Sequence, residues 1–321
     1  MRSHTTTPTC DPHTVNRASR GLLGAAALGA AGLAYAVAEA HHYILRRIAV
    51  PVLAEGQAPL RVLHLSDLHL TPRHNGRIAW VRSLAALQPD LVVVTGDFLA
   101  HPEAVPSALK ALEPLLSRPG VFVLGSNDYF APRFVRPWLY LTAPSELDVG
   151  RTPLPWGELV KGLASGGWHD LSNARARIEV AGRDLDIRGV DDPHIERDRY
   201  DLVQGRFDVT ADLALGVTHA PYLRVLDAMS ADRADLILAG HTHGGQICVP
   251  VFGALVTNCD LDTARAKGLS RHPSDAQTWD SSAETHRAYL HVSAGLGTSP
   301  YAPVRFACPP EATLLTLTAR G

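Results

Sequence analysis

The sequence predicts a layered α/β domain, and three observations lead to this prediction. Short apolar runs rich in leucine and β-branched residues alternate with helical patterns along most of the chain. Of the 321 residues, 46% are hydrophobic and 19% are charged, which allows a large core and excludes a mainly disordered protein. The formal net charge is -2, from 30 basic and 32 acidic residues, so no duplex nucleic acid partner is expected.

Residues 1–58 are expected to form a targeting or membrane-anchor segment and a linker to a domain at residues 59–321. An uncharged apolar run covers residues 21–38, directly after two arginines. Its length is at the lower edge of what spans a bilayer, so it predicts a single N-terminal hydrophobic helix and a membrane-associated protein. Ala36 and Ala38 also form a signal-cleavage pattern, which would give an exported protein. A helix packed on the domain is the third alternative.

The first half of the domain has the pattern of a β-α-β-α-β unit. Buried strands are predicted at residues 61–65, 91–95 and 121–124, with helices near residues 77–87 and 105–116. After a Pro- and Trp-rich stretch, the pattern predicts further strands at residues 176–180, 185–190, 213–218, 236–239 and 290–293. The polar residues 264–287 contain the only candidate long loop in the sequence, which is expected to cover or border the site.

Polar side chains follow successive predicted strands. They are Asp67 and His69, then Asp97, then Asn127 and Asp128, and later His219, His241 and His243. Because the carboxyl ends of parallel strands open on one crevice, we expect these side chains to meet there. Carboxylate, amide and imidazole donors without thiolate suit Mn, Fe or Zn, and they outnumber the ligands of a single ion. Two divalent cations that together promote phosphoester hydrolysis are therefore predicted.

The chain resembles the calcineurin-like metallophosphoesterase superfamily, and within it the membrane-associated bacterial phosphohydrolases. Five motifs carry the resemblance, in this order: Asp67-Leu-His69, Gly96-Asp97, Gly125-Ser-Asn-Asp128, Thr218-His219 and Gly240-His-Thr-His-Gly-Gly-Gln246. The resemblance extends over residues 62–316. It implies a four-layer α/β/β/α sandwich of two mixed sheets, with a dinuclear metal site between them.

The resemblance also implies a role for each matching residue. The implied ligands are Asp67, His69 and His243 for one ion, Asp97 as the bridge, and His219 with His241 for the other ion. Asn127 is expected as a further ligand of the second ion. The residues expected to take part in catalysis are Asp97, Asn127, Asp128 and His219.

The third motif departs from the family's pattern. The family reads Gly-Asn-His followed by Asp or Glu, whereas this chain reads Gly125-Ser126-Asn127-Asp128. Without a gap Ser126 takes the ligand position, whereas a slip of one residue puts Asn127 there. We favour the slip, because an amide oxygen is a better donor to a hard cation than an alcohol. In both alignments the usual histidine is missing, so altered leaving-group chemistry is expected.

Some further residues have a structural explanation beside a functional one. Residues 189–194 contain two aspartates and a histidine after a predicted strand, but Asp before Pro is first a turn signal. His64 is expected in the core. Tyr129, Tyr301 and Arg305 are candidates to line a substrate pocket, where Arg305 would pair with a phosphate.

The expected function is hydrolysis of a phosphoester by metal-activated water, without a covalent intermediate. The substrate is a phosphomonoester, a phosphodiester or a lipid-linked pyrophosphate, the last suggested by the membrane segment. Two alternatives remain: a metal-binding scaffold whose catalysis has weakened, and an envelope binding protein whose histidines only stabilise the fold. The sequence indicates no oligomeric state.

Overall fold

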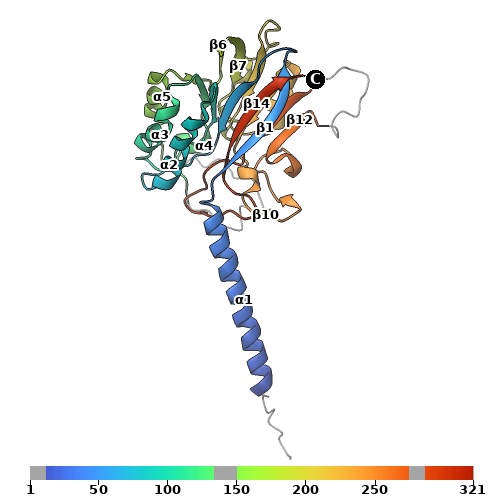
Figure 1. Ribbon diagram of the computed structural model, residues 1–321. Helices are drawn as coiled ribbons and strands as arrows, with labels where there is room; N and C mark the ends of the chain where they lie inside the picture. Colours follow the sequence, from blue (N-terminus) through green and yellow to red (C-terminus); the bar gives the residue numbers. More distant parts are fainter. Residues whose placement is uncertain (1–11, 134–149, 275–285, 321) are drawn as a thin grey trace, which may run out of the picture.

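The computed structural model describes residues 12–133, 150–274 and 286–320, and for residues 12–22 the backbone only (Figure 1). Two six-stranded sheets pack face to face. The first contains, in spatial order, β1 (Ile44–Leu53), β14 (Glu311–Ala319), β2 (Leu60–Leu65), β3 (Leu91–Thr95), β4 (Gly120–Val123) and β5 (His169–Asp170). The second contains β12 (Gly268–His272), β13 (Ala288–Val292), β9 (Leu236–Ala239), β8 (Leu213–Val217), β7 (Arg183–Gly189) and β6 (Ala174–Val180).

Helices cover the outer faces of both sheets. The first sheet carries α2 (Asn75–Ser83), α3 (Val105–Leu112) and α5 (Trp156–Ser165), and the second carries α6 (Leu223–Ala231). The central strands are apolar throughout because both of their faces are buried. In β3, Leu91 and Val93 face the second sheet, whereas Val92 and Val94 face the helices.

The predicted β-α-β-α-β unit is confirmed by β2, α2, β3, α3 and β4. Within this unit both strand pairs, β2 with β3 and β3 with β4, are parallel. Their carboxyl ends therefore open on the same edge of the first sheet. The two mixed sheets are also the arrangement that the resemblance implied.

One sequence prediction needs correction. The domain does not begin at residue 59, because β1 already pairs in parallel with β14, from Ile44 opposite Glu311 onward. Residues 264–287, which contain the candidate long loop, also contain β12, which pairs with β13. Residues 275–285 and most of the Pro- and Trp-rich stretch lie outside the described residues.

The N-terminal helix α1 (Pro12–Glu39) projects from the domain and contacts it at its C-terminal end (Figure 1). There the ring of Tyr35 lies 5.2 Å from that of Phe306, and the carbonyl of Ala36 accepts a hydrogen bond from the backbone N–H of Arg305. In the part of the chain that is described, no helix has both the length and the hydrophobicity to cross a bilayer. The membrane anchor and the cleavable signal stay predictions.

Candidate metal centre

Two groups of side chains at the strand ends could each hold a cation. They are Asp67, His69 and His243 in one group, and Asp67, Asp97 and His219 in the other, with ligand atoms within 4.8 Å of one another in each. One oxygen of Asp97, Oδ2, lies 3.3 Å from Nε2 of His69 and 3.6 Å from Nε2 of His219. Asp97 therefore lies between the two halves of the cluster, where the sequence predicts a bridging carboxylate.

The backbone is strained at this cluster. Five of the candidate ligands have positive φ angles: Asp67 (51°), His69 (41°), Asp97 (56°), His241 (70°) and His243 (49°). Residues other than glycine rarely adopt this left-handed conformation, and such strain concentrates at functional sites. The strand ends are thus bent to turn these side chains toward one another.

Gly125 allows the third strand end to approach the cluster. A Cβ atom at this position would lie 2.4 Å from Oδ1 of Asp97 and 2.7 Å from Cε1 of His219. Both distances are shorter than a van der Waals contact, so a larger residue would displace Asp97. The glycine of this motif is required by packing.

The hydrogen bonds of two histidines leave one ring nitrogen of each for a cation. Nδ1 of His219 lies 2.6 Å from the carbonyl oxygen of Thr95, and Nε2 has no hydrogen-bond partner among the described residues. Nε2 of His241 lies 3.2 Å from the carbonyl oxygen of Asn258. A histidine that donates one N–H to a carbonyl presents its other nitrogen to a metal, which binds there in place of a proton. His219 would therefore bind through Nε2 and His241 through Nδ1.

The charges of the buried groups also fit cations. Burial raises the pKa of Asp67 to about 6, and its Oδ1 has no hydrogen-bond partner among the described residues. Burial opposes ionisation of Asp97 as well, but His219, His69 and the amide of Asn127 hold its pKa below the usual value. Burial lowers the pKa of His69 to about 4. Burial opposes protonation of His219, but Asp97, Asp192 and Asp67 raise its pKa to about 10, so a cation at its Nε2 would replace a proton. With that proton displaced, the cluster offers imidazole nitrogen and carboxylate oxygen, the donor set that Mn, Fe or Zn prefers.

Asn127 contacts Asp97 directly. Its backbone N–H donates to Oδ1 of Asp97 over 2.8 Å, and its side-chain amide donates to Oδ2 over 2.7 Å. Ser126 is buried at the start of the short helix α4 (Ser126–Tyr129). These contacts favour Asn127 over Ser126 as the ligand of a cation beside Asp97, and its role as a ligand stays a prediction.

Asp128 holds the loop that carries Asp97. Its carboxylate accepts hydrogen bonds from four backbone N–H groups: those of Asp97 (2.8 Å), Phe98 (2.7 Å), Leu99 (3.1 Å) and Gly125 (2.9 Å). The side chain is fully buried. Both oxygens therefore accept hydrogen bonds from the backbone, which indicates a positioning role, and the catalytic role expected from the sequence stays a prediction.

Residues 189–194 do reach the site. The ring of His194 lies 4.5 Å from that of His241, and its Nδ1 lies 3.1 Å from the hydroxyl of Tyr222. Asp192 is fully buried, and its Oδ2 has no hydrogen-bond partner among the described residues. No histidine follows β4, but His194 brings one to the same centre from the end of β7.

Two expectations about the substrate pocket are wrong. Arg305 is completely buried, and its guanidinium donates to backbone carbonyls, including those of Ala294 and Gly297 at 2.7 Å. It also lies 3.3 Å from Nδ1 of His243, so it holds a candidate ligand and does not face a substrate. Tyr129 is buried with its hydroxyl on Asp191. Tyr301 is exposed, and His64 lies in the core as expected.

Three residues at the centre have no signal in the sequence. Arg77 donates to the carbonyl of His69, Asn258 accepts from His241, and Arg151 donates to Asn127. Each lies in a segment outside the recognisable motifs, and two of the contacts use a backbone carbonyl. Such contacts depend on the tertiary fold and cannot be inferred from the motif sequence.

Comparisons with known proteins agree with this centre. The family described as calcineurin-like phosphoesterase matches residues 60–245. The chain is 30% identical to the uncharacterized metallophosphoesterase YkoQ of Bacillus subtilis over 249 residues, covering 74% of this chain and 76% of YkoQ. It is 27% identical over 294 residues to UDP-2,3-diacylglucosamine pyrophosphatase LpxG of Chlamydia trachomatis, covering 80% and 83%. A transmembrane protein with a metallophosphoesterase domain from Bos taurus is 30% identical over 221 residues, 62% of this chain and 44% of that protein.

Proposed function

Because the chain belongs to the calcineurin-like phosphoesterases, a family of phosphoric ester hydrolases, we propose that it hydrolyses a phosphoester of an amphiphilic substrate at a membrane surface. Two divalent cations are the proposed cofactors. The observation that carries the proposal is the cluster around Asp97, whose carboxylate lies within 4 Å of imidazoles on both sides. The metal-binding scaffold and the envelope binding protein are the alternatives that the experiment below tests.

The proposed ligands are those predicted from the sequence: Asp67, His69 and His243 for one ion, Asp97 between the ions, and Asn127, His219 and His241 for the other. When bound, divalent cations lower the pKa of water and neutralise charge on a phosphoryl group. His219 keeps its proton on Nδ1 against Thr95, which orients Nε2 into the centre. Asp128 fixes the backbone of Asp97, and Arg305 fixes His243.

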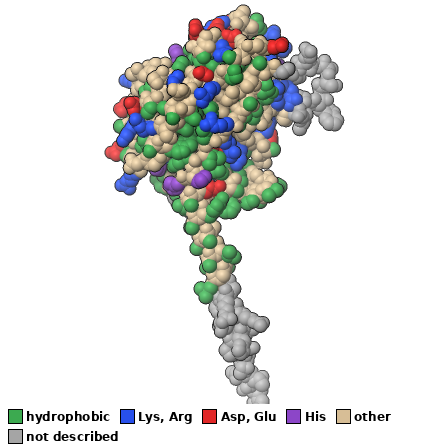
Figure 2. Space-filling view, viewed as in Figure 1, with side chains coloured by type: hydrophobic (Ala, Val, Ile, Leu, Met, Phe, Trp, Pro, Cys, Tyr) green, Lys and Arg blue, Asp and Glu red, His purple; other side chains and the backbone are tan. Residues whose placement is uncertain are grey.

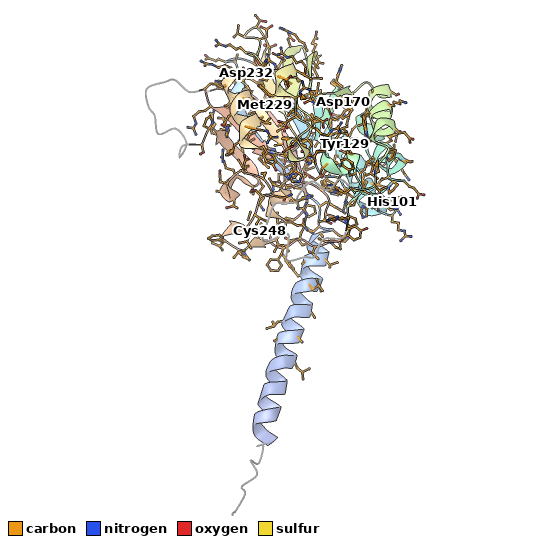
Figure 3. The ribbon with its side chains drawn as sticks, turned by 180° about the vertical axis from the view of Figure 1, so that it is seen from behind. His101, Tyr129, Asp170, Met229, Asp232 and Cys248 are labelled. Carbon is orange, nitrogen blue, oxygen red and sulfur yellow. The ribbon has the colours of Figure 1, made fainter. Side chains whose placement is uncertain are left out.

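A membrane-surface substrate is supported by where the apolar surface lies. After η6 (His243–Gly245), the short strands β10 (Cys248–Val249) and β11 (Gly253–Ala254) form a hairpin at the α1 end of the domain (Figures 1 and 3). Phe252 is 78% exposed and Val251 is fully exposed at the hairpin tip. Figure 2 shows hydrophobic side chains gathered at this end of the domain. Exposed apolar patches of this kind mark lipid or protein contacts.

The hairpin and α1 are connected. Ile247 forms a β-bridge with Phe306, whose ring packs against Tyr35 of α1. The hairpin is therefore linked to the C-terminal end of α1, and Arg305, whose N–H donates to Ala36 of α1, contacts His243. This supports a substrate with an apolar part, such as the lipid-linked pyrophosphate considered from the sequence. The pyrophosphatase name of LpxG agrees with that substrate class.

Metal content and activity of the full-length chain test the function. We would measure manganese, iron and zinc per chain, and hydrolysis of p-nitrophenyl phosphate and bis-p-nitrophenyl phosphate, in the wild type and in Asp97→Asn. Asp201→Asn is the matched control, because Asp201 lies on the surface in an ion pair with Arg199. We expect two metal ions and hydrolysis that Asp97→Asn abolishes. Bound metal without hydrolysis of either ester would favour the scaffold, and absence of metal would refute the proposed centre.

Binding to lipid vesicles tests the membrane surface. We expect the full-length chain to float with phosphatidylglycerol vesicles, and Val251→Asp with Phe252→Asp to reduce the bound fraction without loss of metal. Val209→Asp is the control, because Val209 is equally exposed and lies outside the hairpin. Equal reductions in both variants would contradict a role of the hairpin.

A further inference from the structure

Three arginines donate hydrogen bonds to candidate ligands, and they differ in burial. Arg77 donates to the carbonyls of Leu68 and His69, and Arg305 contacts His243. Both are buried, and their guanidinium groups are engaged by backbone carbonyls. Arg151 is partly exposed and contacts a side chain of the centre, that of Asn127. Of these three, Arg151 is the one that is partly exposed beside the centre.

The fold holds Arg151 in place beside the third strand end. The backbone of Thr152 accepts a hydrogen bond from the N–H of Ala131 over 2.8 Å, and Leu154 donates to the carbonyl of Tyr129 over 2.8 Å. The guanidinium itself donates from Nε to the carbonyl of Ala131 over 3.1 Å and from a terminal nitrogen to that of Phe130 over 3.0 Å. These contacts orient the planar group before any substrate binds, which reduces the entropy lost on binding.

A short chain of hydrogen bonds links Arg151 to the centre. A terminal nitrogen of Arg151 donates to Oδ1 of Asn127 over 2.9 Å, and Nδ2 of Asn127 donates to Oδ2 of Asp97 over 2.7 Å. Arg151 is therefore two hydrogen bonds away from Asp97, on the side of the centre formed by Asn127.

The orientation of the Asn127 amide decides whether Arg151 can keep its hydrogen bond to Asn127 when a cation is bound. At present its oxygen faces Arg151 and its nitrogen faces Asp97. If the amide oxygen turned toward a cation beside Asp97, the amide nitrogen would face Arg151, and two donors would oppose each other. The hydrogen bond from Arg151 to the amide oxygen would then be lost, and an anionic oxygen of a bound substrate would be a better acceptor for that donor than the amide nitrogen.

We propose that Arg151 binds the phosphoryl oxygens of the substrate and stabilises the charge that develops on them, in a third motif that lacks the usual histidine. This inference rests on the proposed function. A guanidinium suits the task because it is permanently charged and its planar donors match the geometry of a phosphate. Arg151 is thereby assigned a catalytic role that does not require it to gain or lose a proton.

The competing explanation is structural, since Arg151 also fixes the backbone of Phe130 and Ala131. The two roles differ in what a substitution changes. Loss of a structural contact lowers the unfolding temperature and affects all substrates and metal binding together. Loss of a phosphoryl contact weakens binding of free phosphate and lowers kcat/KM while the metal content stays the same.

The experiment compares Arg151→Gln, Arg151→Lys and Arg151→Ala with the wild type. Arg199→Gln is the matched control, because Arg199 is an exposed arginine paired with an aspartate on the surface. For each full-length protein loaded with manganese, we would measure metal content, unfolding temperature, the affinity for inorganic phosphate by calorimetry, and kcat and KM for the two nitrophenyl esters. We would also measure whether millimolar guanidinium ion restores the activity of Arg151→Ala.

We expect Arg151→Gln to bind phosphate at least about tenfold more weakly and to lose about 10²-fold in kcat/KM, with unchanged metal content. Arg151→Lys should retain part of the affinity, and guanidinium should restore part of the activity of Arg151→Ala. Unchanged phosphate affinity in Arg151→Gln, or a loss that follows metal content, would overturn the proposal.

The proposed role of Arg151 and the proposed function can each fail without the other, and the experiments distinguish the two failures. If the wild type hydrolyses neither ester, the function itself fails, and phosphate affinity still reports on Arg151. If the wild type is active, Asp97→Asn is inactive and Arg151→Gln is fully active, only the role of Arg151 is refuted. A loss of phosphate affinity in His194→Gln but not in Arg151→Gln would likewise refute it.

Discussion

His219 donates its Nδ1–H to the carbonyl oxygen of Thr95 over 2.6 Å, and this contact joins the end of β8 to the end of β3. The same bond fixes the tautomer, so Nε2 is the nitrogen that faces Asp97 at 3.6 Å. This hydrogen bond from a side chain to a backbone carbonyl thus decides which atom of His219 is offered to a cation. The two functions of the ring, holding the sheets in register and binding metal, are carried by different nitrogens.

Replacing His219 by Asn or Gln should separate these functions. Asparagine can keep a donor near the position of Nδ1 but has no atom at Nε2, so we expect it to fold and to bind manganese at least about 100-fold more weakly. Glutamine reaches farther and should retain more metal at the cost of the Thr95 contact. Calorimetry with manganese and thermal unfolding of the metal-free proteins measure the two effects. Wild-type manganese affinity in His219→Asn would contradict the assignment of Nε2.

Asn127→Ala and Ser126→Ala test which residue of the third motif binds metal. Asn127 contacts Asp97 through its side chain, whereas Ser126 is packed at the start of α4. We therefore expect Asn127→Ala to bind the second metal ion about 10- to 100-fold more weakly and Ser126→Ala to keep two ions per chain. Metal analysis after dialysis against dilute chelator distinguishes the two. The reverse result would restore the alignment without a gap.

Asp128→Asn should destabilise the protein without removing a metal ligand. An amide nitrogen would replace one of two oxygens that each accept two backbone N–H groups, so buried donors would face a donor. We expect a loss of about 3 kcal/mol in the free energy of unfolding. Denaturant unfolding measures it, with Asp201→Asn as the exposed control. An unchanged stability together with a changed pH profile of kcat would instead support a direct catalytic role.

The sequence predicted the centre better than the sheet edges. The candidate ligands could be found because each follows a buried strand, and parallel strands must bring their ends together. The edge and return strands β1 and β14 were missed, since β1 carries charged residues and proline in an exposed edge position. Their pairing joins residues 44 and 311, a contact that no local pattern can show.

The residues that surround the ligands could not be predicted either, because their contacts also join parts of the chain that are far apart in the sequence. Arg305 was a candidate to line a substrate pocket because a guanidinium can pair with a phosphate. In the fold its guanidinium donates to the backbone carbonyls of Ala294, Gly295 and Gly297 instead. Arg151, in contrast, was not predicted from the sequence but contacts the centre. It follows a stretch without any motif, and its position depends on the pairing of residues 129–131 with residues 152–154.

The buried pair of His64 and His291 predicts how stability depends on pH. Their Nδ1 atoms lie 2.9 Å apart, and both rings are fully buried between the sheets. Burial lowers the pKa of His64 well below its usual value and that of His291 to about 3. The folded protein therefore keeps both rings neutral, whereas the unfolded chain takes up protons below about pH 6.5. Stability from this pair is complete above pH 6.5 and is lost as the pH falls.

His291→Leu should reduce by one the number of protons that the chain takes up on unfolding, and so weaken this pH dependence. Between pH 6.5 and pH 4, we expect the slope of the free energy of unfolding against pH to fall by about 1.4 kcal/mol per pH unit relative to the wild type. Urea unfolding of the metal-free proteins at several pH values gives the slope, and His169→Gln is the control because His169 is exposed. Comparing slopes cancels the titration of the histidines in the metal centre, which all three proteins share. Equal slopes for His291→Leu and the wild type would mean that His291 accepts a proton in the folded state, contrary to its burial.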